Sequence, residues 1–399
     1  MKILLADTFP ESQREVLRTQ GHECELQPKL IAAELPAAAV GIDVLIVRST
    51  RVEAAVFEQS DVRLVIRAGA GYNTIDVMAA ADRGVYVCNV PGKNAVAVAE
   101  LAFGLLLALD RNIPDNVTDL RAGTWHKSRY QRAAGLYGRA VGVVGIGAIG
   151  LAFAERARSF GMAVHAVAKP SRSAAAKRRL DALGVIYHPD LHALAAACDV
   201  LSFHVPGDPT TKGLIGRELL ARVRPGTFLI NTSRGDLVDE EALLAALDEK
   251  KLRAGLDVFV DEPAAGEAEF VSVLAQHPNV YGTHHIGAST SQAQHAVADE
   301  VVEIVASFQA GEIRNCVNLA AVRGSTTLVV RHDNEVGVLA GVLGALGRAG
   351  ISVEQVENRL FAGGRAAAVA IQLGGSIDAA LRAEIEALQG VIGVSAEPR

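Results

Sequence analysis

The stretch AVGVVGIGAIGLAFAERARSFG, residues 140–161, decides the fold of the middle of this chain. Small and β-branched apolar residues lead into Gly145, Gly147 and Gly150, and an Ala-rich helical pattern follows. A strand, a GxGxxG loop and a helix in this order are typical of a doubly wound α/β domain that binds the pyrophosphate of a dinucleotide. The glycines permit a tight turn, close backbone approach to the phosphates, and close packing of helix on strand. We therefore expect the whole loop to contact the cofactor, namely Gly145, Ile146, Gly147, Ala148, Ile149 and Gly150.

The residues beyond this loop bear on which dinucleotide is bound. An NAD-binding loop is usually followed, about 20 residues on, by an acid that hydrogen-bonds the ribose 2′-hydroxyl. Here that position falls near Ala168, and no Asp or Glu occurs from Arg156 to Leu180. The neighbouring cations and hydroxyl are suited to a 2′-phosphate and are predicted cofactor contacts: Lys169, Ser171 and Arg172. The pattern favours NADP or dual use and leaves NAD open.

Short apolar runs alternate with helical stretches over the first 290 residues. The predicted strands are MKILLAD, DVLIVRS, VRLVIRAG, VYVCNVPG, AVGVVGIG, MAVHAV, VLSFHV, TFLINTS, RAGLDVF and NVYGTHH. Strands of this kind separated by helices predict parallel sheets covered on both faces, and their number favours a pair of doubly wound parallel-sheet α/β domains. After about residue 320 the order becomes β-α-β-β-α-β, which predicts a small ferredoxin-like module.

Composition excludes several classes of function. The net charge of −6 disfavours general affinity for nucleic acid or an anionic membrane. The apolar run LAFGLLLAL (101–109) is too short to span a bilayer and predicts a buried helix. The N-terminal segment meets an acid too early for a signal peptide, so we expect a soluble, cytoplasmic protein. No pair of cysteines has metal-ligand spacing, so we expect no metal site and buried thiols at Cys24, Cys88, Cys198 and Cys316.

Chemistry-bearing side chains follow later predicted strands, where ligands of open α/β sheets bind. INTSRGDLVDEEAL carries Arg234, LDVFVDEP carries Asp257 and Glu262, and YGTHHIGAST carries His284 and His285. An arginine can grip an α-carboxylate in a forked pair, and a histidine can exchange a proton with the neighbouring oxygen. A glutamate beside that histidine orients it and stabilises its charged form. Together with the glycine loop, these residues predict hydride transfer between a nicotinamide cofactor and a 2-hydroxy or 2-oxo acid.

Five motifs occur together in the first 320 residues: RAGAGYNTID (67–76), GIGAIG (145–150), NTSRGDLVDEEAL (231–243), LDVFVDEP (256–263) and HHIGAST (284–290). With these motifs the segment resembles the D-isomer-specific 2-hydroxyacid dehydrogenase family. The resemblance implies a catalytic arginine at Arg234, a supporting glutamate at Glu262 and the acid/base histidine at His285. The family usually has proline where His284 stands, and His285 is chosen because it aligns with the family's HxGAST.

The resemblance also implies the domains and the binding residues. It implies a discontinuous, flavodoxin-like substrate-binding domain (1–93 and 288–318), a Rossmann nucleotide domain (94–287) and a C-terminal module (322–399). Further cofactor contacts are implied at His204, Val205, Pro206, Thr232, Ser233, Asp257 and Gly287. Substrate contacts are implied at Arg48, Ser49, Arg67, Ala68, Gly69, Ala70 and Asn94.

Two of these cations, Arg48 and Arg67, favour a dianionic substrate. We expect oxidation of 3-phosphoglycerate to 3-phosphohydroxypyruvate, the first step of L-serine biosynthesis. Reduction of hydroxypyruvate, glyoxylate or another 2-oxo acid stays open, as does an NAD(H)-sensing regulator with little turnover.

The C-terminal module resembles an ACT domain. RHDNEVGVL (331–339) is similar to that family's HxNxPGVL, with Val336 in place of the proline. The resemblance implies a homo-oligomer, dimer or tetramer, and an amino-acid effector bound through His332, Asn334 and Ser352.

Overall fold

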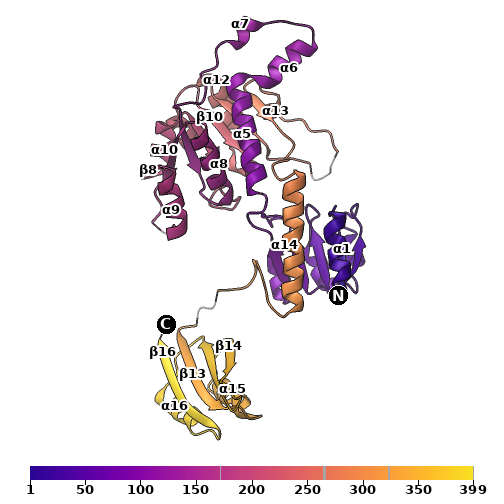
Figure 1. Cartoon of the computed structure of the whole chain (residues 1–399), viewed down its shortest axis with the longest axis vertical. Coiled ribbons are helices and arrows are strands. Elements are labelled where there is room, and N and C mark those ends of the chain that lie inside the picture. The colour runs from indigo at the N-terminus through magenta and orange to yellow at the C-terminus, as the bar shows by residue number, and fades with distance from the viewer. Residues whose placement is uncertain (171, 264–266, 322–323, 399) are drawn as a thin grey trace. The chain divides into compact units, whose positions relative to one another are not determined.

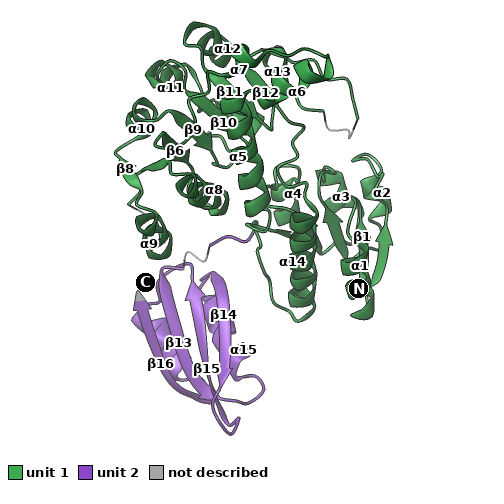
Figure 2. Ribbon diagram, turned by 45° about the horizontal axis from the view of Figure 1, so that its top comes forward, with its two compact units in different colours: residues 1–318 green, residues 319–399 purple. Residues whose placement is uncertain are grey.

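The computed structural model describes residues 1–170, 172–263, 267–321 and 324–398. In this described part the chain divides into two compact units, Met1–Asn318 and Leu319–Arg399 (Figures 1 and 2). None of the helices within the described residues combines the length and hydropathy that crossing a bilayer requires.

The N-terminal sheet of the first unit has the strand order β2-β1-β3-β4-β5, and its neighbouring strands are parallel. Its strands are β1 (Lys2–Leu5), β2 (Glu23–Leu26), β3 (Val44–Val47), β4 (Leu64–Arg67) and β5 (Tyr86–Asn89). The helices between them are α1 (Glu11–Thr19), α2 (Leu35–Ala38), α3 (Ala54–Gln59) and α4 (Val77–Asp82). A later helix, α14 (Ser291–Gln309), packs Val301 and Val305 against Ile3 and Ile46 of this sheet. The sheet is therefore covered on both faces, as its apolar strands predict.

The second sheet has the order β12-β11-β10-β9-β6-β7-β8 and is parallel throughout its pairings. Its strands are β6 (Ala140–Val144), β7 (Ala163–Val167), β8 (Ile186–His188), β9 (Val200–Phe203), β10 (Phe228–Asn231), β11 (Arg253–Leu256) and β12 (Val280–Gly282). Its α-helices are α5 (Ala95–Arg111), α6 (Ile113–Arg121), α7 (Lys127–Tyr130), α8 (Ala148–Ser159), α9 (Ala174–Ala182), α10 (Leu191–Ala197), α11 (Arg217–Arg222), α12 (Glu240–Glu249) and α13 (Val273–Gln276). A short 3₁₀ turn, η1 (Gly235–Leu237), follows β10. The strand order reverses direction between β6 and β9, so the loops after these strands diverge and leave the crevice where such sheets bind ligands.

The sequence-based prediction of parallel α/β sheets is confirmed, but its list of strands was incomplete. It missed β2 and β8, which lie at the outer edges of their sheets. Both are short and largely solvent-facing, with charged or polar residues at alternate positions of β2. An edge strand pairs on one side only and needs no continuous apolar run, so hydrophobicity alone does not reveal it. The buried helix predicted at 101–109 is confirmed as the centre of α5.

A buried carboxylate on α14 contacts the segment that connects the first sheet to the second, which we call the crossing. Glu300 on α14 forms an ion pair with Lys93, with 3.1 Å between Glu300 Oε2 and Lys93 Nζ. Lys93 lies in the crossing, between β5 and α5. The same carboxylate accepts hydrogen bonds from Arg314 Nε at 2.7 Å and Asn315 Nδ2 at 3.0 Å. Burial alone would raise the pKa of Glu300, but the bonds from Arg314 and Lys93 outweigh it and leave that pKa below its usual range.

The second unit is an antiparallel sheet in the order β14-β15-β13-β16, with the predicted β-α-β-β-α-β succession. Its elements are β13 (Thr326–Asp333), α15 (Val338–Arg348), β14 (Val353–Leu360), β15 (Ala366–Leu373), α16 (Ala379–Glu386) and β16 (Val391–Pro398). Val342, Leu346 and Ile385 of the helices pack on Leu328 and Ile371 of the strands.

Candidate active site

The glycine loop lies between β6 and α8, as its sequence predicts. Gly145 has φ 94°, and a Cβ built there would lie 2.6 Å from the backbone carbonyl of His204. Only glycine therefore lets the loop after β6 pass the loop after β9. Gly147 faces open space, and no side chain caps the first turn of α8. The free N–H groups at the start of this helix fit a pyrophosphate.

The residues predicted to flank the cofactor after β9 and β10 are largely buried. The ring of His204 packs on Phe153, and burial lowers the pKa of His204 to about 3, so the imidazole is neutral. Ser233 Oγ donates to the Phe203 carbonyl at 2.8 Å, which commits that hydroxyl to the protein. Among the described residues, Thr232 Oγ1 and His204 Nδ1 are buried without a hydrogen-bond partner. These unpartnered atoms beside the glycine loop fit a site for a polar ligand.

The basic loop after β7 lies at the carboxyl end of that strand. Arg172 donates to the Val167 carbonyl at 3.1 Å, and its guanidinium lies 5.8 Å from the centre of the Tyr187 ring. Lys169 is exposed, and its carbonyl accepts the Arg172 N–H at 3.1 Å. Ser171, the third predicted contact, lies outside the described residues. Arg172 is thus held where a doubly wound domain binds the adenosine ribose.

His285 and Glu262 form a pair, with 2.6 Å between His285 Nδ1 and Glu262 Oε1. A carboxylate can only accept, so Nδ1 carries the shared proton, and Nε2 is the nitrogen that remains for exchange with a substrate. His285 adopts a left-handed backbone conformation with φ 52°, which is uncommon for a residue other than glycine. His284 lines the same cleft and makes no hydrogen bond to a described residue.

The turn that carries His285 is organised by Asp257, at the end of β11. Its carboxylate accepts N–H bonds from Ile286 and Gly287, each at 2.9 Å, and the Thr283 hydroxyl at 2.6 Å. Its backbone carbonyl accepts the His285 N–H at 2.8 Å. Asp257, predicted as a cofactor contact, therefore also positions the histidine. The sequence analysis missed Thr283, because a single threonine outside any motif gives no signal.

Arg234 is positioned by a residue that the sequence did not single out. Asn231, fully buried at the end of β10, donates Nδ2 to the Arg234 carbonyl at 2.8 Å and accepts the Ser233 N–H at 3.0 Å. The Arg234 guanidinium lies against Gly71, and a side chain at that position would displace it. An asparagine at a strand end three residues before a predicted site arginine is the signal that could have found Asn231.

Three arginines from separate strands meet at one cleft. Arg48 follows β3, Arg67 ends β4 and Arg234 follows β10. Burial, followed by the charges of Arg234 and Arg48, lowers the pKa of Arg67 to about 10. Among the described residues none of the three forms an ion pair, and the buried Arg67 Nε has no hydrogen-bond partner. Such positive charge, offset only in part by Asp7, is suited to an anionic ligand.

The cleft has a volume of about 1550 Å³. Its walls include the predicted catalytic residues and most predicted substrate contacts: Arg48, Ser49, Arg67, Ala68, Gly69, Asn94, Arg234, Glu262, His284 and His285. Ala70 and the Gly145–Gly150 loop are not part of its lining; the Ala70 carbonyl instead accepts Asn89 Nδ2 at 2.6 Å. The buried Oδ1 of Asn94 has no partner among the described residues.

Asp7, at the end of β1, fixes the Arg48 segment and was also missed. One of its oxygens accepts the N–H groups of Arg48, Ser49 and Thr50 at 2.6, 3.1 and 3.2 Å. The other accepts Ser49 Oγ at 2.9 Å. The hydroxyl of Ser49, a predicted substrate contact, therefore donates to Asp7 and helps to hold the loop after β3.

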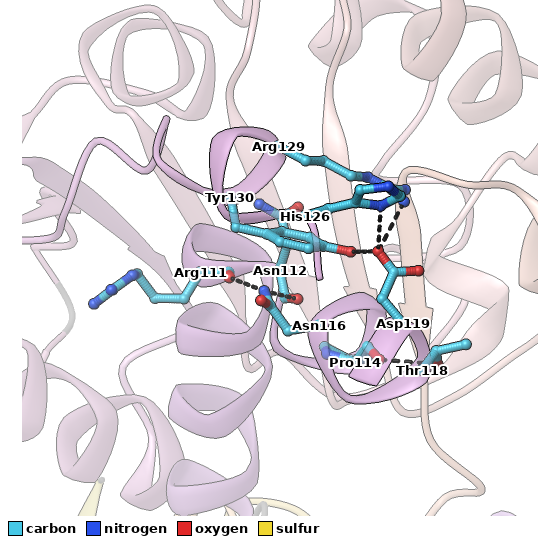
Figure 3. A network of polar contacts seen from close by, with 9 residues as sticks. All are labelled: Arg111, Asn112, Pro114, Asn116, Thr118, Asp119, His126, Arg129 and Tyr130. Carbon is cyan, nitrogen blue, oxygen red and sulfur yellow. Dashed lines mark hydrogen bonds and ion pairs between the residues drawn. The ribbon is translucent and has the colours of Figure 1, made fainter. Parts of the chain in front are cut away.

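A projecting arm, residues 112–138, contains α6 and α7 (Figure 1). In Figure 3, Asp119 Oδ2 accepts Tyr130 Oη at 2.6 Å and contacts Arg129 at 3.3 Å and His126 at 3.4 Å. These bonds hold α7 against α6. The arm nevertheless exposes large apolar side chains, including Trp125 at 77% and Tyr137 at 89%.

The predicted effector residues do not gather within one copy of the second unit. His332 is buried, with Nδ1 2.7 Å from the Asp333 carbonyl and Nε2 3.3 Å from Asn358 Oδ1. Asn334 Nδ2 donates to the Gly364 carbonyl at 2.8 Å. Ser352 precedes β14 and lies beside Gly374, at the opposite end of the sheet, because β13 and β14 both run antiparallel to β15.

Comparison with known proteins identifies the family of this chain. Residues 103–287 match the family described as "D-isomer specific 2-hydroxyacid dehydrogenase, NAD binding domain". Hydroxypyruvate reductase from Thermotoga maritima is 40% identical over 267 residues, which are 66% of this chain and 83% of that protein. A solved acyclic imino acid reductase in complex with NADPH and D-Arg is 26% identical, with a TM-score of 0.70 over 79% of this chain and 100% of that one.

Several curated relatives are longer than this chain. D-3-phosphoglycerate dehydrogenase from Methanocaldococcus jannaschii is 38% identical over 323 residues, which are 80% of this chain and 60% of that protein. The chain thus spans about 60% of the length of the first curated relatives that it matches. The identity, the coverage of the Thermotoga relative and the matching nucleotide-binding region lead to one conclusion: this chain belongs to the D-isomer-specific 2-hydroxyacid dehydrogenase family.

Proposed function

We propose that this protein transfers a hydride between a nicotinamide dinucleotide and a D-2-hydroxy acid. The preferred reaction is the oxidation of 3-phosphoglycerate to 3-phosphohydroxypyruvate. The observation that carries the proposal is the cleft that combines the His285–Glu262 pair with Arg48, Arg67 and Arg234. The resemblance to D-3-phosphoglycerate dehydrogenases supports the choice of substrate.

The residues divide the work of the reaction. Arg234 grips the α-carboxylate and polarises the C2 oxygen. His285 Nε2 takes the hydroxyl proton during oxidation and returns it during reduction, while Glu262 holds the ring and stabilises the imidazolium. The glycine loop would hold the pyrophosphate of the dinucleotide, and the bound cofactor would supply the hydride chemistry. The segment held by Asp257 keeps the imidazole aimed at the substrate.

The dianion preference is the first test. We expect kcat/KM for 3-phosphoglycerate to exceed that for D-glycerate roughly 100-fold, because Arg48 and Arg67 gain a partner only from the phosphate. Steady-state rates with both acids, and with hydroxypyruvate and glyoxylate in the reverse direction, measure this. Equal efficiencies would favour a reductase of unphosphorylated 2-oxo acids. Binding without turnover of any acid would favour the nucleotide-sensing alternative.

For the cofactor, we propose use of NADP or of both dinucleotides. The support is the absence of an acid near Ala168 and the position of Arg172 at the carboxyl end of β7. A guanidinium there is suited to a 2′-phosphate, and Lys169 adds a second cation.

Replacing Arg172 with alanine tests this cofactor assignment. KM for NADP should rise about 10-fold and KM for NAD less than 2-fold, since only NADP carries the phosphate. Arg178→Ala is the matched control, because Arg178 belongs to the same basic run but is exposed on α9. Equal changes for both cofactors would assign the basic loop to the solvated surface.

We also propose the domain roles that the family resemblance implies. Residues 1–93 and 288–318 bind the substrate, residues 94–287 bind the nucleotide, and residues 322–399 form an ACT-like module. The βαββαβ succession supports the last assignment. The apolar side chains of the 112–138 arm support a homo-oligomer, either a dimer or a tetramer. Any amino-acid effector would bind near His332 and Asn334. Sedimentation of the full chain with and without amino acids tests both.

A further inference from the structure

Two of the cysteines face each other across a strand pairing at the edge of the first sheet. Residues 315–318 run antiparallel to β5, and Cys316 is the direct partner of Cys88 in that pairing. Cys88 is 1% exposed, and Cys316 is half-buried against the same core. Their thiols share a hydrogen bond. The sequence predicts only that each cysteine is buried, since 227 residues separate them along the chain.

The flanking hydrogen bonds define the geometry of this pair. Asn89 N–H donates to the Asn315 carbonyl at 3.1 Å, and Val317 N–H donates to the Val87 carbonyl at 2.8 Å. Both bonds lie beside the Cys88–Cys316 pair rather than within it, so this is a non-hydrogen-bonded pair of an antiparallel ladder. The Cα atoms of such a pair are about 4.5 Å apart, and the side chains approach closely on one face. Disulfides accept Cα separations of about 4.4 to 6.8 Å, so the bond forms without moving the backbone.

We propose that Cys88 and Cys316 are a redox-sensitive pair that a small-molecule disulfide oxidises to a cross-strand disulfide. The half-buried Cys316 reacts first: its thiolate attacks one sulfur of the small disulfide and releases one small thiol. Cys88, as thiolate, then attacks Cys316 Sγ and releases the second. The protein loses two protons and two electrons, which leave on the two small thiols.

The environment sets the order and pace of these steps. The hydrogen bond with Cys316, and then burial, raise the pKa of Cys88 in the reduced protein. Burial persists once Cys316 carries the small thiol, so the Cys88 thiolate is scarce and the second step is the slower one. Cys316 Sγ also lies 3.1 Å from Asn318 Oδ1, within the segment that the disulfide would fix.

The position of Cys88 and Cys316 determines which parts of the protein the disulfide would hold together. Residues 315–318 are the last of the first unit before the chain continues into the second. Asn89, next to Cys88, holds the Ala70 carbonyl in the predicted substrate loop. Oxidation therefore links residues 314–318, the exit segment, covalently to β5 of the N-terminal sheet. The bond lies next to Asn89, which holds the predicted substrate loop.

Incubation of the full-length protein with oxidised glutathione tests the proposal. The mass should fall by about 2 Da, for the two hydrogens lost, with no glutathione retained. A digest under non-reducing conditions should contain a single linked peptide joining Cys88 to Cys316. The midpoint of thermal unfolding should rise by about 5 °C, and amide exchange at Val317 should slow.

Variants identify the cysteines. A Cys24→Ser/Cys198→Ser double variant should still form the bond, because neither cysteine takes part in this pairing. Cys316→Ser should abolish it, and Cys88→Ser should instead hold one glutathione at Cys316. If the wild-type protein stops at a stable Cys316–glutathione adduct, links a different pair, or keeps all its thiols, the proposal is wrong.

Discussion

Replacing His285 with asparagine is expected to lower kcat for 3-phosphoglycerate oxidation at least ~100-fold, because the variant has no group to take the hydroxyl proton. Asparagine is the right replacement for the backbone as well. His285 has φ 52°, and asparagine is among the residues that best tolerate the left-handed region. The backbone turn held by Asp257 should therefore survive, and the loss should reflect chemistry. Steady-state kinetics, with thermal unfolding as a check on folding, measure it.

The matched control is His284→Asn, one residue earlier on the same cleft wall. His284 has no described carboxylate partner, in contrast to the bond between His285 and Glu262. Its replacement should change kcat less than about 3-fold, because it lacks the orientation that proton transfer needs. If His284→Asn carried the large loss and His285→Asn did not, the proton-transfer role would belong to His284.

Replacing Arg234 with glutamine should lower kcat/KM roughly 100- to 1000-fold, since the substrate carboxylate would lose its charged, forked partner. Stability should move the other way. Arg234 is one of the charges that lower the pKa of Arg67 below its usual range, so the folded protein holds these cations against mutual repulsion. Removing Arg234 relieves that repulsion, and the thermal midpoint should stay the same or rise.

Arg234→Lys separates charge from geometry. Lysine keeps the charge but offers no planar fork, so it should recover only part of the lost kcat/KM. Arg217→Lys, at an exposed position on α11, is the control for the exchange itself and should leave kcat/KM unchanged. A fall in thermal midpoint that tracked the fall in activity would contradict this account, because it would indicate damaged packing.

The sequence predicted the parts of the molecule whose physical cause is local. Gly145 and Gly150 are required because the strand, turn and helix pack closely around them, and most of α5 is apolar because it is buried. The strands β2 and β8 escaped notice because an edge position makes little demand on hydrophobicity. That side chains after the central strands would lie together could be predicted, since those strand ends converge in any parallel sheet.

What the sequence could not supply were relations between distant segments. Asp7 and Asn231 carry no motif, yet they fix Arg48 and Arg234 through short hydrogen bonds. Ser352 was grouped with His332 by family resemblance, but strand direction puts them at opposite ends of the sheet. Each relation depends on strand register, which a pattern within one segment does not encode.

Glu300 gives the first unit a mechanical property. The crossing that carries Lys93 and the exit segment that carries Arg314 are both fastened to this one carboxylate on α14. A rotation of the nucleotide-binding part about its crossing must therefore either carry the exit segment with it or pull a cation away from a buried negative charge. The second course is costly because the buried carboxylate would keep only one of its two cations. Glu300 thus couples the two segments, so that a movement of the Lys93 segment is transmitted to the Arg314 segment, where the chain leaves the unit.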